Sequence, residues 1–174
     1  MKILHQNIKI PALKGTRTIA QAPELFTGWL DSDFKNCGTD IKGSKTKETK
    51  ETKLVELEMD KDATFADIFT DPEAMALSQE QILYFVENHK DKLHPDGWYT
   101  FFLFKVSNDF FVAHVSRSGR GLRAFVVRLS RGSVWNADDR RRVVVPQHSL
   151  ESSDSLSLAI ETVKKAGYKI IKEI

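Results

Sequence analysis

Apolar and polar residues alternate most clearly between positions 54 and 60. Val55, Leu57 and Met59 are separated from one another by acidic residues. An alternation with a period of two predicts a β-strand with one buried face. A shorter strand is expected at residues 8–10, and because Pro11 ends it, we place it at an edge of the sheet.

A period of 3.6 residues follows further along the chain. Ile82, Phe85 and Val86 are spaced as one apolar face of a helix. Ser78 and Gln81 have the spacing of a capping box, in which each side chain accepts a hydrogen bond from the other residue's backbone N–H. These signals predict a helix over residues 79–93.

The period returns to two after residue 97. Three short segments rich in Asn, Asp, Ser and Gly separate four apolar runs, which is typical of a β-meander. The four predicted strands cover residues 98–106, 110–116, 122–129 and 140–145. The first of them is apolar on both faces, so we expect it to be central and covered by a helix.

Shorter elements complete the prediction. Thr64 begins a short helix, Ser153 or Asp154 caps a second main helix ending near residue 166, and residues 168–174 read as a terminal strand. The order of elements predicts an α+β fold: a mostly antiparallel β-meander of about five to six strands with two main helices packed on one face.

Length and composition favour one domain spanning residues 1–174. Residues 43–53 have low complexity, with a Lys-Glu-Thr repeat and no apolar side chain, and are expected to form a mobile loop within the domain. No apolar run is long enough to span a membrane, and no signal peptide is recognisable. With a single cysteine, Cys37, these features predict a cytoplasmic protein without a membrane partner.

The distribution of charge is uneven. Eight of the nine arginines fall within residues 117–142, where they give a local charge of +6 with two aspartates, whereas residues 54–89 carry −8. The arginines are Arg117, Arg120, Arg123, Arg128, Arg131, Arg140, Arg141 and Arg142. Such a split is typical of a nucleic-acid face, but the two segments could equally pair with each other.

The turns of the meander suggest a binding site. If consecutive strands were antiparallel neighbours, Arg128, Arg131, Arg140 and Arg142 would meet at one end of the sheet. Trp135 lies between them in the sequence and would supply a ring for stacking. Arginine binds phosphate through two parallel hydrogen bonds, so this group predicts binding of a polyanion, with nucleic acid as the first candidate.

A catalytic alternative rests on two histidines. His114 on a strand and His148 after the last strand could act with arginines as a metal-independent phosphodiesterase or ribonuclease. This hypothesis requires His114 to be accessible to solvent. The histidines lack metal-ligand spacing, the close aspartate pairs fall in turns, and there is no nucleotide-binding glycine loop, so neither a metal nor a cofactor is expected.

A third hypothesis involves no catalysis. The protein would bind another protein or its own copy, or inhibit a partner. In that case the acidic segment would be the working face, or would neutralise the arginines within the molecule. Arginines paired individually with Glu56, Glu58, Asp67 or Glu87 would favour it.

Overall fold

The computed structural model describes residues 1–36 and 48–150. The predicted helix ending near residue 166 and the predicted strand at residues 168–174 lie outside these residues, as do residues 43–47 of the loop predicted at 43–53. The described end of that loop belongs to the sheet, because Thr49 forms a β-bridge with Leu13 and β3 begins at Thr52.

One seven-stranded sheet organises the molecule, in the order β1-β3-β7-β4-β5-β6-β2. The strands are β1 (Lys2–Ile10), β2 (Trp29–Leu30), β3 (Thr52–Glu58), β4 (Thr100–Val106), β5 (Asp109–Ser118), β6 (Gly121–Arg128) and β7 (Arg142–Pro146). The strands predicted between residues 54 and 145 are thus confirmed, with small changes at their ends, and the edge strand predicted at 8–10 is the last part of β1.

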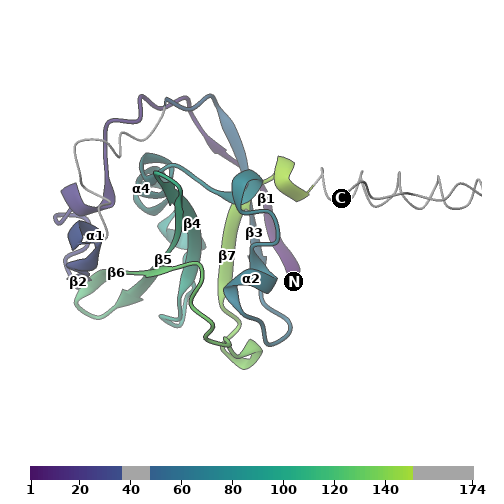
Figure 1. Cartoon of the computed structure of the whole chain (residues 1–174). Coiled ribbons are helices and arrows are strands. Elements are labelled where there is room, and N and C mark those ends of the chain that lie inside the picture. The colour runs from purple at the N-terminus through teal and green to yellow at the C-terminus, as the bar shows by residue number, and fades with distance from the viewer. Residues whose placement is uncertain (37–47, 151–174) are drawn as a thin grey trace, which may run out of the picture.

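The predicted meander is wrong beyond its third strand. β4, β5 and β6 form antiparallel hairpins, but β7 does not pair with β6. Instead β7 lies between β3 and β4, antiparallel to the first and parallel to the second (Figure 1). Residues 129–141 cross one face of the sheet between β6 and β7, so the sheet is mixed. β2 adds a further parallel pair at its edge.

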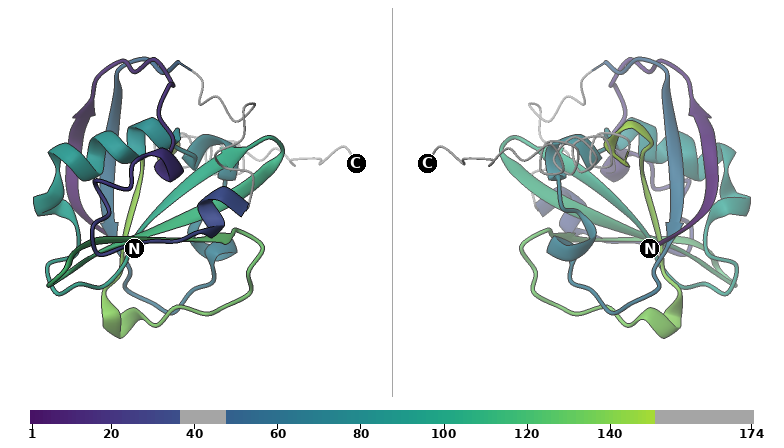
Figure 2. Two further views of the ribbon diagram at one scale, coloured as in Figure 1. Left: turned by 90° about the vertical axis from the view of Figure 1, so that its left-hand side faces the viewer. Right: turned by 90° about the vertical axis from the view of Figure 1, so that its right-hand side faces the viewer.

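Helices cover both faces, which corrects the prediction that they share one. The first face carries α4 (Gln79–Asn88), α1 (Asp33–Asn36) and the 3-10 helix η1 (Ile19–Gln21). The second face carries α2 (Phe65–Ile68), α3 (Pro72–Met75) and the crossing segment. The 3-10 helices η2 (Lys90–Lys92) and η3 (Ala137–Asp139) flank these elements. Figure 2 shows α4 lying across one side of the sheet.

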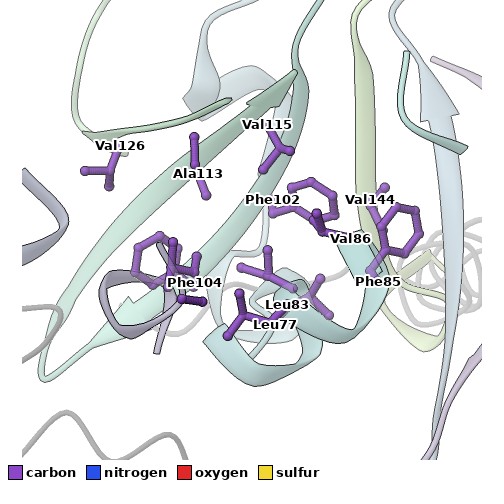
Figure 3. Packing of buried hydrophobic residues seen from close by; sticks show 14 of the residues in the cluster. Leu77, Leu83, Phe85, Val86, Phe102, Phe104, Ala113, Val115, Val126 and Val144 are labelled. Carbon is purple, nitrogen blue, oxygen red and sulfur yellow. The ribbon is translucent and has the colours of Figure 1, made fainter. Parts of the chain in front are cut away.

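The capping box predicted at Ser78 and Gln81 is confirmed, with both reciprocal hydrogen bonds present. The helix ends at Asn88, and η2 takes up most of the rest of the predicted range. The apolar face of α4 packs on the central strands, where Phe85 meets Phe102 edge to face (Figure 3). β4 is buried on both faces, as predicted: Phe102 and Phe104 contribute to one core, Phe101 and Leu103 to the other.

Candidate nucleic-acid interface

The eight clustered arginines divide into two groups in the structure. Six are exposed, Arg128 among them, and within residues 1–36 and 48–150 five of these six pair with no carboxylate. The five unpaired ones are Arg117, Arg120, Arg123, Arg131 and Arg140. The other three, Arg128, Arg141 and Arg142, each form an ion pair.

Arg142 is held inside the protein. Its guanidinium donates to a carboxylate oxygen of Glu56 at 2.8 Å and to the carbonyl of Lys92 at 2.7 Å. Glu56 has no exposed surface and also contacts Nδ1 of His5 at 2.6 Å. Buried carboxylates need such partners, so Arg142 is fixed as a structural counter-ion and is not free for a ligand.

The strand register separates the arginines expected to converge. Arg128 lies opposite Phe111 at one end of the sheet, whereas Arg142 lies opposite Thr100 towards the other end. Two strands, β4 and β5, stand between β6 and β7. Arg128 also faces away from the crossing segment, on the first face, where it lies over the ring of Phe111 and pairs with Asp109 at 3.0 Å. The predicted group of four therefore does not form a single site.

Trp135, the predicted stacking residue, packs on the second face. Its ring lies 5.1 Å from that of Phe101 and 5.2 Å from that of His114, centroid to centroid. The guanidinium of Arg141 covers it at 4.7 Å and also lies 5.6 Å from the ring of Trp98. Trp135 is half-buried and Trp98 is 44% exposed, so Trp98 is the more accessible of the two rings.

Arg141 is unusual because it is buried and charged. Only 8% of its surface is exposed, and burial lowers its pKa, opposed by the carboxylate of Asp139, with which it forms an ion pair. Its Nε has no hydrogen-bond partner among the described residues. Two aromatic rings and one carboxylate therefore fix this guanidinium beneath the surface.

His114 does not meet the condition set for a catalytic histidine. It is 4% exposed and enclosed by aromatic rings, including Phe65 and Tyr99. Burial, with the nearby charges of Arg131 and Arg141, lowers its pKa to about 3, so it is neutral at physiological pH. It therefore cannot receive a substrate without rearrangement of the core, and the phosphodiesterase hypothesis loses its general base.

His148, the second catalytic candidate, is exposed and lies elsewhere. With Gln147 and residues 51–53 it lines a hollow of about 460 Å³ at the β3–β7 end. His114 is aligned with Val143 through Phe101, and His148 follows Val143 by five residues. β7 ends at Pro146, which at 3.3 Å per residue and about 4.8 Å per strand is already roughly 14 Å from His114, and His148 lies beyond that end, too far to act with His114 on one phosphate.

Two of the clustered arginines and three residues that the sequence did not single out form a row across the second face. Because paired residues in neighbouring strands share a face, the register aligns Trp29 of β2 with Arg123 of β6, and Arg123 with Ser116 of β5. Continuing the β4–β5 register by one residue aligns Ser116 with Tyr99. The carbonyl of Tyr99 accepts a hydrogen bond from the N–H of Arg142, and continuing the β4–β7 register by one residue aligns Tyr99 with Arg141. We call these five residues, Trp29, Arg123, Ser116, Tyr99 and Arg141, the Trp29–Arg141 row.

Both ends of the row contain an aromatic residue next to an arginine. Trp29 is 56% exposed and stands beside exposed Arg123, and Tyr99 stands beside Arg141, which also touches Trp98. At about 4.8 Å between strands, the five positions span about 19 Å. Half-buried Phe125 lies two residues after Arg123 on β6, on the same face, with its ring 6.0 Å from that of Tyr99.

The position of Trp29 depends on a close approach between two backbones. The N–H of Gly28 donates to the carbonyl of Leu122 at 2.9 Å, and that of Asp31 donates to Ala124 at 3.0 Å. A Cβ on Gly28 would lie 2.9 Å from two carbonyl oxygens of β6, so only glycine fits here. Two residues of strand are too few to show a period, and therefore the alternation could not predict β2.

The acidic segment neutralises the arginines at one point. Among the ion pairs of the described residues, Arg142–Glu56 alone joins residues 54–89 to the arginine cluster. Other acids of that segment pair with Arg17, Lys105 and the N-terminal amine. Most of the cationic charge of residues 117–142 is thus left without an internal partner in the described part of the chain.

Across the described residues, no three histidine, cysteine or acidic side chains are grouped closely enough to hold a metal ion. In the same residues, none of the helices combines the length and the apolar character that a membrane span requires.

Comparisons with family models, with curated proteins and with solved structures found no match.

Proposed function

We propose that the protein binds a polyanion, with nucleic acid as the first candidate, through the exposed arginines of residues 117–142. The observation that carries this proposal is the set of five exposed arginines, none of which pairs with a described carboxylate. Phosphate is a good partner for arginine, because the planar guanidinium donates two parallel hydrogen bonds to its oxygens.

The geometry favours a different set of residues from that expected. Arg131 and Arg140 remain candidates, being exposed. Arg142 is engaged by Glu56 and Arg128 faces away from the crossing segment, so we replace them with the arginines around the β5–β6 hairpin. These are Arg117, Arg120 and Arg123, which lie within seven residues of one another at one end of the sheet.

A salt series tests the proposal. Binding of a fluorescein-labelled 12-nucleotide RNA should weaken steeply as salt rises, since each phosphate that an arginine neutralises releases a counterion. The triple variant Arg117→Gln, Arg120→Gln, Arg123→Gln should bind at least tenfold more weakly at low salt. Its affinity should also depend less steeply on salt, by about 0.7 in log–log slope for each phosphate that is no longer neutralised.

The matched control removes three charges at the opposite edge. Lys2, Lys9 and Lys53 are exposed on β1 and β3, and replacing all three by Gln should reduce binding much less. Equal losses in both triple variants would mean that only net charge matters. Absence of binding at low salt would refute the proposal and leave the arginines to face a protein partner.

We also propose a reducing, cytoplasmic setting for this activity. A chain whose single cysteine is Cys37 has no internal disulfide that an oxidising compartment could form.

A further inference from the structure

We infer that the preferred polyanion is a single strand of nucleic acid, laid across the second face of the sheet along the Trp29–Arg141 row with a base stacked on Trp29. This inference rests on the proposed function and adds to it the form of the nucleic acid and the path that it follows.

Trp29 is unusually exposed for its residue type. Its exposed fraction is 56%, although a tryptophan ring can bury more apolar surface than almost any other side chain. Leu30, the next residue, turns to the opposite face and packs on the core there. Leu30 therefore packs β2 against the core, while Trp29 is exposed on the second face.

Positive charge lies next to this exposed ring. The register places Arg123 directly beside Trp29 on the same face, and no described carboxylate neutralises it. A stacking ring next to a free guanidinium matches one nucleotide, because the base stacks on the ring and the guanidinium donates to the phosphate.

A second exposed ring lies near the other end of the row. Trp98 is 44% exposed and stands beside Arg141, but Arg141 is itself buried and paired with Asp139, so only the ring is open to a ligand there. Small, buried Ser116 lies between Arg123 and Tyr99. The span of about 19 Å suits about three to six nucleotides of one strand, at a rise of 3.4 Å or more per nucleotide.

The exposed ring distinguishes a single strand from a duplex. In a duplex the bases are stacked on each other and show no free ring face, whereas unpaired bases stack readily on aromatic side chains of an open sheet. Exposed tryptophan on a sheet face therefore favours a single strand. An anion without bases, held by the arginines alone, would make no stacking contact with Trp29.

The test compares Trp29→Ala with Trp29→Phe. We expect the alanine variant to bind a labelled 12-nucleotide oligouridine at least fivefold more weakly, the usual effect of losing one stacked base, while the phenylalanine variant keeps most of the affinity. Binding of inorganic polyphosphate, which has no bases, should be unchanged in both. Circular dichroism checks that each variant keeps the fold.

A pair of arginine variants gives a matched control for the path. Arg123 and Arg117 lie near each other on β6 and β5, but Arg117 belongs to the alternate positions of β5 that face the first core, with Ala113 and Val115. Each variant to Ala removes one charge. We expect Arg123→Ala to weaken oligouridine binding more than Arg117→Ala does, and a 12-base-pair RNA duplex to bind more weakly than oligouridine.

The outcomes distinguish this inference from the proposed function. Suppose that oligouridine, duplex and polyphosphate all bind, that Trp29→Ala binds like the wild type, and that Arg123→Ala binds like Arg117→Ala. The single-strand inference is then wrong and the polyanion proposal stands. If none of the three binds, both are wrong. A 12-nucleotide oligothymidine distinguishes DNA from RNA, and tight binding of either one, lost in Trp29→Ala, supports the inference.

Discussion

His114 has a polar ring in a buried site that the aromatic rings of Phe65, Tyr99, Phe101 and Trp135 surround. Its Nε2 has no hydrogen-bond partner among the described residues, and its pKa is lowered to about 3. In the unfolded chain the pKa of histidine is about 6.5, so between pH 6.5 and pH 3 the unfolded state binds a proton that the folded state excludes. Stability is therefore complete above pH 6.5 and falls as the pH falls towards 3.

His114→Phe should remove this acid sensitivity. From the two pKa values, His114 should account for roughly 3 kcal/mol of unfolding free energy lost between pH 7 and pH 4. Urea unfolding at both pH values measures the difference between variant and wild type. His94, whose pKa burial also lowers, contributes to both proteins alike and cancels in the comparison. An equal loss in both proteins would show that His114 is accessible to protons.

Arg142 illustrates why an arginine in a basic cluster need not touch a ligand. Arg142→Ala leaves Glu56 with no exposed surface and without its guanidinium, so we expect a loss of about 3–5 kcal/mol of stability. The double variant Glu56→Leu, Arg142→Met should recover much of that loss, because it leaves no buried charge unpaired. Thermal unfolding of the three proteins decides, and a stable Arg142→Ala protein would contradict the structural role.

At the scale of elements, β2 depends on one glycine. Gly28→Ala places a methyl group 2.9 Å from the carbonyl oxygens of Gly121 and Leu122, and backbone atoms cannot give way cheaply. We expect β2 to separate from β6, with a loss of about 1–3 kcal/mol and a weaker seat for Trp29. Gly119→Ala is the control, since a Cβ there meets nothing within 4 Å. Equal stability of the two variants, by thermal unfolding, would argue against the tight docking of β2.

Local signals explain which elements could be predicted. Strands β3 to β6 and the start of α4 follow from alternation, turn residues and a capping box, all of which act over a few neighbouring residues. The place of β7 depends on residues 129–141 crossing a whole face, and on Trp135 packing against Phe101 and His114. No local pattern records those contacts, so the simpler hairpin was the wrong prediction.

The candidate site was predictable only in part. Composition identified the arginine cluster but not which of its members reach the surface. Burial of the counter-ion Glu56, which removes Arg142 from the surface, required the pairing of β3 with β7. Trp29 is 94 positions from Arg123 in the sequence, and only the parallel β2–β6 pair brings them together.

For the whole molecule, we expect nucleic acid to bind on the second face of the sheet and not at the edge formed by β1. Among the described residues, exposed Arg117, Arg120, Arg123 and Arg140 lie around the end of the sheet that contains the β5–β6 hairpin and the start of β7, whereas bulged β1 forms the opposite edge of the sheet. Bulges interrupt the pairing of that edge strand and make it a poor template for another chain.

The most direct measurement is a nuclear magnetic resonance titration with oligouridine, following the backbone amides and the three tryptophan side-chain N–H signals. We expect the signals of Trp29 and Trp98 and the amide of Arg123 to shift, while half-buried Trp135 and the amide of Lys9 on β1 change little. Shifts centred on β1 and β3, or none at saturating oligouridine, would contradict binding along the Trp29–Arg141 row.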